Sequence, residues 1–101
     1  MIKKKKIYKN FNELLQERLQ DPKLAMAYLN EALQDADQNV FLIALKDVID
    51  AQGQDISALA KRAHISRQNL YRMLSQKGNP RWDNIASLID VMGFQVQLLP
   101  K

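Results

Sequence analysis

Hydrophobic residues recur three and four positions apart along most of the chain, which is the pattern of helices that bury one face. The first two such stretches run from Asn10 to Leu19 and from Asp21 to Leu33. Four more follow, over 41–53, 55–63, 66–75 and 83–92. The pattern predicts a mainly all-α protein, a five-helix domain preceded by an N-terminal helical extension.

Short polar side chains mark where these helices begin, because their oxygen atoms accept hydrogen bonds from the free N–H groups of a first turn. Four precede apolar stretches: Asn10, Asp21, Asp55 and Ser66. Gly53 can take the left-handed conformation that ends a helix. In the last helix we expect Asp83 to be the N-cap and Trp82 to anchor the helix in the core.

The end of the chain changes to a period of two. Its apolar residues alternate with glutamines, in the order Phe94, Gln95, Val96, Gln97 and Leu98. This alternation is typical of a half-buried strand, and a single strand must pair with another. Two partners are open: the same segment of a second copy across a two-fold axis, or the N-terminal sequence KKKIY of the same chain. The sequence therefore predicts a short C-terminal β-strand.

The chain has 101 residues, enough for one small domain, and its charge is uneven. Residues 1–9 hold five lysines and no acid, residues 10–54 hold three basic and eight acidic residues, and residues 55–101 hold seven basic and three acidic residues. A basic C-terminal half favours a polyanion as partner. The acidic middle fits either a basic partner or an ordinary solvated helix surface.

Several classes of protein are excluded or disfavoured by what the sequence lacks. It has no cysteine, so it has neither a disulfide framework nor a thiolate metal site. The lysine-rich start is not followed by the apolar core of a signal peptide, and the longest apolar run, Val40 to Leu45, is far short of the roughly 20 residues that span a bilayer. His64 is the only histidine, and no nucleophile and base stand at a usable spacing. We expect a cytoplasmic protein that is not an enzyme, with no cofactor, metal or membrane partner.

Residues 55–75 have the features of a helix-turn-helix. Two short helices are joined by about three residues, with the small Ala60 inside the first and the apolar Ile65 at the turn. On a helical wheel the apolar residues of the second helix, Leu70, Met73 and Leu74, share one side and leave a polar side opposite. We therefore divide the chain into a basic arm and short helix at 1–20, a candidate partner-binding segment, and a single helix-turn-helix domain at 21–101.

The polar side of the second helix carries residue types that hydrogen-bond to base edges in the major groove of DNA. We expect base contacts from Arg67, Gln68, Tyr71, Arg72 and Ser75. Tyr71 has a second interpretation as a partly packed helix tyrosine. Phosphate contacts are expected from Ser57, Lys61, Arg62, Ser66, Asn69, Lys77 and Arg81. Each cation alone fits a solvated surface equally well, whereas their grouping around one motif favours DNA.

A single motif of this size seldom binds DNA tightly by itself, because operators offer paired half-sites about 34 Å apart. We therefore predict a homodimer on double-stranded operator DNA.

The run LAKRAHISRQNLYRMLSQKGNPRWDNIASLIDVMGFQVQL, with DPKLAMAYLNEALQDADQNVFLIALKDVIDAQG before it, resembles the HigA-like addiction-module antidotes, which are antitoxins with an Xre-type, lambda-repressor-like helix-turn-helix. LA, ISRQNLY, GNP and MGF stand in that family's order. The resemblance implies the antitoxin of a type II toxin–antitoxin module that represses its own operon and neutralises a RelE/HigB-like toxin encoded beside it.

Two residues depart from the family pattern. His64 stands where the family usually has a turn glycine, and histidine can adopt the left-handed conformation at some cost. Ile56 stands where a glutamine often grips a phosphate, so that contact is lost or taken over by Ser57.

Two alternative functions remain open from the sequence. One is a stand-alone or phage-type transcriptional regulator. The other is a helical protein-interaction module that retains the motif only as a scaffold, without DNA binding. Paired half-sites and a steep loss of affinity with salt would distinguish operator binding from the second alternative.

Overall fold

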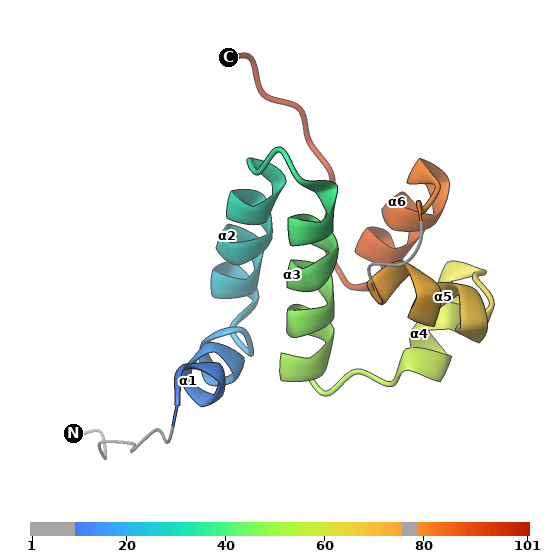
Figure 1. The fold of residues 1–101 in the computed structure, drawn as a ribbon, viewed down its shortest axis with the longest axis horizontal. Helices are drawn as coiled ribbons and strands as arrows, with labels where there is room; N and C mark the ends of the chain where they lie inside the picture. Colours follow the sequence, from blue (N-terminus) through green and yellow to red (C-terminus); the bar gives the residue numbers. More distant parts are fainter. Residues whose placement is uncertain (1–9, 76–78) are drawn as a thin grey trace.

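The computed structural model describes residues 10–75 and 79–101, which form six helices (Figure 1). They are α1 (Phe11–Arg18), α2 (Pro22–Leu33), α3 (Gln38–Ala51), α4 (Ile56–Ala63), α5 (Arg67–Leu74) and α6 (Trp82–Val91). The mainly helical prediction is confirmed: the described residues form six helices, α1 included, and they contain no strand. No helix within these residues is long and apolar enough to cross a membrane.

Side-chain caps begin α1, α2, α4 and α5 at the predicted residues, whereas α3 begins three residues earlier than predicted, with Asp37 as its N-cap. Asn10 accepts a hydrogen bond from the Glu13 N–H at 3.0 Å, and Asp21 accepts one from the Lys23 N–H at 2.9 Å. Asp55 and Ser66 cap α4 and α5 in the same way. These bonds satisfy N–H groups that the first turn of a helix leaves without an internal partner.

The prediction for the start of α6 is wrong by two residues. Arg81 is the N-cap, and Asp83 lies inside the first turn, where its carboxylate accepts from the Asn84 N–H at 2.9 Å. An acid in the first turn favours a helix through the dipole as well as through a cap, so the residue type alone does not separate the two positions.

Helix α3 is the centre of the fold. Its Leu42, Leu45 and Ile49 are fully buried, and each contributes roughly 1.5–3 kcal/mol by leaving water. Helices α1 and α2 lie on one side of α3, and α4, α5 and α6 lie on the other (Figure 1). The boundary predicted between residues 20 and 21 falls in the turn between α1 and α2, and the buried Leu19 joins α1 to the common core.

One polar contact fixes α2 against α3. The hydroxyl of Tyr28 donates to Oδ2 of Asp47 at 2.7 Å. Partial burial, followed by this hydrogen bond and the negative charge of Asp47, raises the pKa of Tyr28 to about 12. The tyrosine is therefore neutral and able to donate at any physiological pH.

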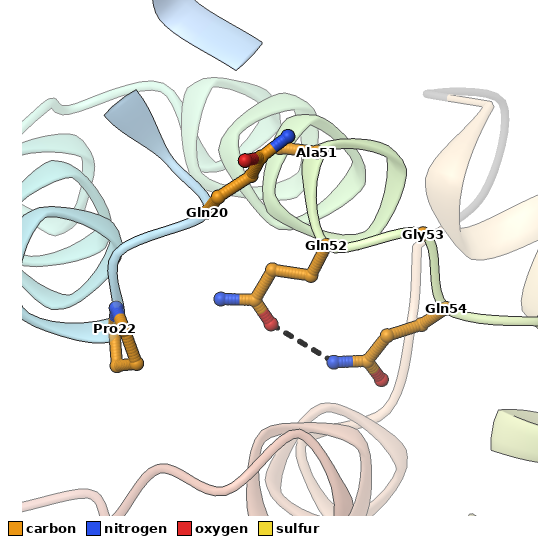
Figure 2. Close-up of a pocket in the computed structure, with 6 residues that line it drawn as sticks. All are labelled: Gln20, Pro22, Ala51, Gln52, Gly53 and Gln54. Atoms are coloured by element: carbon orange, nitrogen blue, oxygen red, sulfur yellow. Dashed lines mark hydrogen bonds between the residues drawn. The ribbon is translucent and has the colours of Figure 1, made fainter. Parts of the chain in front are cut away.

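A second polar contact joins the α1–α2 turn to the end of α3. Nε2 of Gln52 donates to the carbonyl of Leu19 at 3.3 Å, and Nε2 of Gln54 donates to Oε1 of Gln52 at 2.9 Å. Figure 2 shows both amides in a hollow of about 520 Å³, lined by Gln20, Pro22, Ala51, Gln52, Gly53 and Gln54. Its lining has no ionisable side chain, and we assign it a structural role.

Three turns share one hydrogen-bond arrangement. After α3, α4 and α6 the chain passes through a residue of positive φ: Gly53 at 63°, His64 at 58° and Gly93 at 94°. At His64, the His64 N–H donates to the Lys61 carbonyl and the Ile65 N–H donates to the Ala60 carbonyl. These are the two hydrogen bonds of a Schellman motif. The left-handed conformation expected of His64 is confirmed.

The predicted C-terminal strand is not formed within the described residues. Residues 94–101 carry no ladder, because no other described segment is a strand with which they could pair. The N-terminal KKKIY sequence considered as a partner lies outside the described residues. Phe94 packs against the core, and the chain beyond it runs past the α2–α3 turn (Figure 1).

The core role predicted for Trp82 is also wrong, since its side chain is 62% exposed. Trp82 lies one turn before the buried Ile85 and two turns before the buried Ile89, at the correct spacing for the same apolar stripe. It is the first helical residue, however, and it extends beyond the edge of the core onto a surface groove. Periodicity gives the correct face of α6 and misses where the core ends.

Candidate nucleic-acid interface

Helices α4 and α5 are joined by three residues, His64 to Ser66, and pack closely. The side chains of Ala60 and Ile65 are buried at their junction, as the sequence predicts. A side chain larger than alanine at position 60 would separate the two helices. The pair is fixed to the rest of the fold because α4 packs on α6 and α5 packs on α3.

The apolar stripe of α5 is buried, with Leu70 fully enclosed and Met73 and Leu74 almost so. Its opposite face is open to solvent. All five residues expected to contact bases are exposed: Arg67, Gln68, Tyr71, Arg72 and Ser75. The packing therefore determines which side chains of α5 face outward, and it turns the polar set away from the core.

Arg67 and Tyr71 form a pair on this face. The guanidinium carbon lies 5.5 Å from the centroid of the tyrosine ring, within cation–π range. A hydrogen bond to Tyr71 raises the pKa of Arg67 further, so the guanidinium stays charged. Tyr71 is 49% exposed, and it holds the arginine along the helix surface rather than packing into the core.

The other side chains of this face differ in freedom. The Ser75 hydroxyl donates to the Arg72 carbonyl at 2.9 Å, which ends the helix. Within residues 10–75 and 79–101, no hydrogen bond or ion pair engages the side chain of Gln68 or the guanidinium of Arg72. These two can therefore rotate to meet a partner, whereas Arg67 and Ser75 are already oriented.

Four of the residues expected to contact phosphates lie on α4 and at the start of α5: Ser57 is in the first turn of α4, Lys61 is in its last turn, and Ser66 and Asn69 are at the N-terminal end of α5. Ser66 accepts from the Asn69 N–H at 3.0 Å and so forms the N-cap of α5. Ser57 and Lys61 are exposed on α4, and Asn69 is half-buried. The positive end of α5 and these side chains form an anion-attracting margin beside the polar face.

Two of the predicted phosphate-binding arginines already have partners inside the protein. Nη2 of Arg62 donates to the carbonyl of Val91 at 2.9 Å and thus ties α4 to the end of α6. Nε of Arg81 pairs with Asp83 at 3.2 Å on the surface. Lys77, also expected to contact phosphate, lies outside the described residues.

A polar cleft beside α5 was not predicted from the sequence. It has a volume of about 350 Å³ and is lined by Asn69, Arg72, Met73, Asn79, Pro80, Arg81 and Asn84. Asn79 and Asn84 are the residues that the sequence analysis missed. The signal was weak, because an Asn-Pro turn and an asparagine in a first helical turn are usually structural. Amide and guanidinium groups around one hollow suit an oxyanion.

These observations define a small helical protein with a polar, basic face on α5 and an acidic half across α3. Residues 7–100 match the family described as "Probable addiction module antidote protein". An uncharacterized protein of Haemophilus influenzae (strain Rd) is 37% identical over 71 residues, which cover 70% of this chain and 71% of that protein. No solved structure matches the chain.

The chain belongs to this family of probable addiction module antidote proteins. The family description implies a toxin partner in general terms. It names neither a DNA site nor a particular toxin.

Proposed function

We propose that the protein is the antitoxin of a type II toxin–antitoxin module, which represses its own operon as a homodimer and neutralises a RelE/HigB-like toxin. It acts by binding and not by catalysis. The observation that supports operator binding is the outward face of α5, where polar side chains are exposed while the apolar stripe beneath them is buried. A helix of this kind fits the major groove with its side chains against base edges.

Within this proposal the side chains of α5 have different roles. Gln68 and Arg72 are unengaged within the described part of the chain and exposed, so they read bases, with arginine suited to guanine and glutamine to adenine. Arg67, stacked on Tyr71, enters the groove already oriented. Ser75 lies at the far end of the helix and reads an outer base.

The phosphate contacts provide affinity without sequence information. In this proposal Ser57, Lys61, Ser66 and Asn69 contact phosphates of the DNA backbone, and the polar cleft around Arg81 and Asn84 binds a further phosphate. Arg62 contributes through structure, because its guanidinium already binds the Val91 carbonyl.

We place the toxin on the opposite side of the molecule. Helices α1 and α2 and the outer surface of α3 lie across α3 from α5, in the segment with eight acidic and three basic residues (Figure 1). A RelE/HigB-like toxin with a basic surface would meet this half. The same chain would then hold toxin and operator together.

The first experiment measures binding to the DNA upstream of the gene by gel shift. We expect Gln68→Ala to weaken binding by about 1–3 kcal/mol, roughly 5-fold to 150-fold, and to relax base preference at one position. The matched control is Gln16→Ala, since Gln16 is an exposed glutamine of α1. Equal affinities of the two variants on a randomised DNA library would reject the assignment of α5.

The same assay tests the phosphate contacts through salt. Lys61→Ala should weaken binding to all sequences alike and lower the salt slope by about 0.9, the value for one lost phosphate contact. Lys23→Ala, an exposed lysine of α2, should leave the slope unchanged. Identical slopes for both lysine variants would mean that Lys61 faces only solvent.

Toxin binding is tested by charge reversal rather than by deletion, because Leu19 at the end of the N-terminal segment is buried and its loss would damage the core. The variant Glu31→Lys reverses charge on the exposed surface of α2, away from the groove beside Trp82. It should lose toxin neutralisation in cells and keep the gel shift. Retained neutralisation would place the toxin elsewhere, and loss of both activities would point to misfolding, which circular dichroism checks.

A further inference from the structure

The segment after Gly93 has the alternating sequence of a strand, but no described segment lies beside it as a paired strand. The Phe94 N–H donates to the Ile89 carbonyl at 3.1 Å and completes the turn. From residue 95 onward, no backbone hydrogen bond joins the tail to any other described segment. A strand left in this state offers a row of free N–H and C=O groups to another chain.

The side chains of this tail are apolar and exposed. Leu98 is 93% exposed and Leu99 is 78% exposed. Burying such side chains in the monomer would stabilise it by roughly 1.5–3 kcal/mol each, yet the described core does not cover them. The tail is thus an apolar surface without an internal partner among the described residues.

The tail borders a largely apolar groove of about 500 Å³ formed with α6 and the α2–α3 turn, whose lining also includes Asp35 and Asp37. Among its lining residues are four of the ten large hydrophobic residues exposed in the described chain: Leu33, Trp82, Val96 and Leu98. These four residues present on the order of 400 Å² of apolar surface, in the range of about 300–600 Å² at which a patch on a monomer often marks a binding site. Four of the exposed apolar residues therefore share one groove.

Electrostatics favours a second copy as the occupant. When two identical strands pair antiparallel about a two-fold axis, one residue faces its own copy, and charged residues near the axis would face like charges. The sequence from Phe94 to Leu99, FQVQLL, has no charged residue. Its glutamine side chains both donate and accept, so identical glutamines can bond to each other across the pair. Pro100, which has no N–H, ends the ladder before Lys101.

We propose that residues 94–99 form an antiparallel two-stranded ladder with the same residues of a second copy, and that this ribbon covers the grooves beside Trp82 of both protomers. The ladder satisfies the free backbone groups and buries the apolar patch. Adding the paired backbones to the patch brings the contact toward the roughly 800 Å² per partner of a stable interface. This proposal specifies how the homodimer proposed above is held together. It depends on the proposed function only in assuming that two copies associate.

Sedimentation equilibrium of the full chain tests the apolar contact. The double variant Val96→Asp, Leu98→Asp places carboxylates on the groove-facing side and should weaken dimerisation at least 100-fold. The matched control is Leu24→Asp, which adds a carboxylate at an exposed leucine of α2 that lies outside both the groove and the tail; its dimerisation constant should change less than 10-fold. A dimer that tolerates the double variant, or a wild-type chain that stays monomeric, would overturn the proposal.

A cysteine scan tests the ladder itself, since the protein has no cysteine of its own. Single cysteines at Gln95, Val96, Gln97 and Leu98 are oxidised, and disulfide dimers are counted. A two-fold ladder brings one residue next to its own copy while residues two positions away are separated by far more than disulfide distance. Cross-linking should therefore peak at one position, with Gln16→Cys as the control for random collision.

Uniformly low cross-linking at the level of Gln16→Cys would reject the ladder. A monomer whose tail amides are protected from hydrogen exchange would instead assign the tail to its own KKKIY sequence, which also overturns the proposal. Gel shifts of the same variants separate this proposal from operator binding. If the cysteine variants cross-link but the protein does not bind the DNA, only the proposed operator binding is rejected. If the protein binds the DNA and the double variant Val96→Asp, Leu98→Asp leaves that complex unchanged, only the proposed ladder is rejected.

Discussion

The turns at His64 and at Gly93 are built alike and lead to opposite outcomes. In both, the residue of positive φ and its successor donate hydrogen bonds back into the last turn of the preceding helix. The chain after His64 enters helix α5 within three residues. The chain after Gly93 remains extended and unpaired among the described residues.

The difference lies in the residues that follow, and not in the turn. After His64, Ile65 is buried and Ser66 caps the next helix, whose apolar stripe packs on α3. After Gly93, only Phe94 reaches the core, and the period-two pattern beyond it cannot wind into a helix with one apolar face. A turn thus ends one element, and the polar pattern after it determines the next.

The largest expected effect is on the free energy of unfolding, and it tests whether burial of the apolar stripe of α5 holds this helix in position. Leu70→Ala should lower the free energy of unfolding by about 2–5 kcal/mol, because Leu70 is fully buried and its loss leaves a cavity. Leu99→Ala in the tail should change it by less than about 0.5 kcal/mol in the monomer. Urea denaturation at low protein concentration measures both, and similar losses would erase the contrast between the two regions.

Gly93→Ala tests the turn before the tail. Its φ of 94° lies outside the small left-handed region open to other residues, so the substitution should cost about 1–2 kcal/mol. A Cβ there would meet no atom within 4 Å, which leaves backbone conformation as the cause. Gly53→Ala is the control, with a smaller loss expected at its φ of 63°. Equal thermal shifts for the two glycines would contradict this reasoning.

Arg62→Ala tests the link between the two regions. The Arg62 guanidinium binds the Val91 carbonyl near the end of α6, shortly before the tail begins. Its removal should cost about 1 kcal/mol, the usual net value of one hydrogen bond, and leave the DNA salt slope unchanged. Lys61→Ala should do the reverse. A reduced slope for Arg62→Ala would restore the sequence-based expectation that Arg62 binds phosphate.

The smallest expected effect is a gain. His64→Gly relieves the cost of a left-handed histidine, about 1–2 kcal/mol, but adds freedom to the unfolded chain, so the net stabilisation should be about 0.5 kcal/mol. His64→Ala keeps the strain and serves as the control. Calorimetric melting temperatures compare the variants, and a lower melting temperature for the glycine variant would show that the histidine side chain itself stabilises the turn.

Much of the fold follows from local rules, and the exceptions have specific causes. Ser66 and Asp55 were identifiable as caps, and Leu70, Met73 and Leu74 as a buried stripe, because these depend on neighbours in the sequence. Trp82 was misassigned because the edge of a core is a tertiary property that periodicity does not report. The strand was not found because pairing needs a partner that the described chain lacks.

In the candidate site, too, the features set by neighbouring residues could be predicted and the long-range contacts could not. The exposure of Gln68 and Arg72 follows from their position on α5 relative to the stripe. The engagement of Arg62 with Val91, 29 positions away in the sequence, could not be predicted, nor could the cleft that gathers Asn79 and Asn84. Long-range contacts of this kind depend on how helices cross.

The bond from Arg62 to Val91 also has a mechanical consequence. It ties the end of α4, shortly before α5 begins, to the last residue of α6, close to the point where the tail departs. If two copies join through their tails as proposed above, the spacing between their two α5 helices is set by the protein and not by its ligand. On the proposed operator, half-sites moved apart by two base pairs would no longer fit both helices at once.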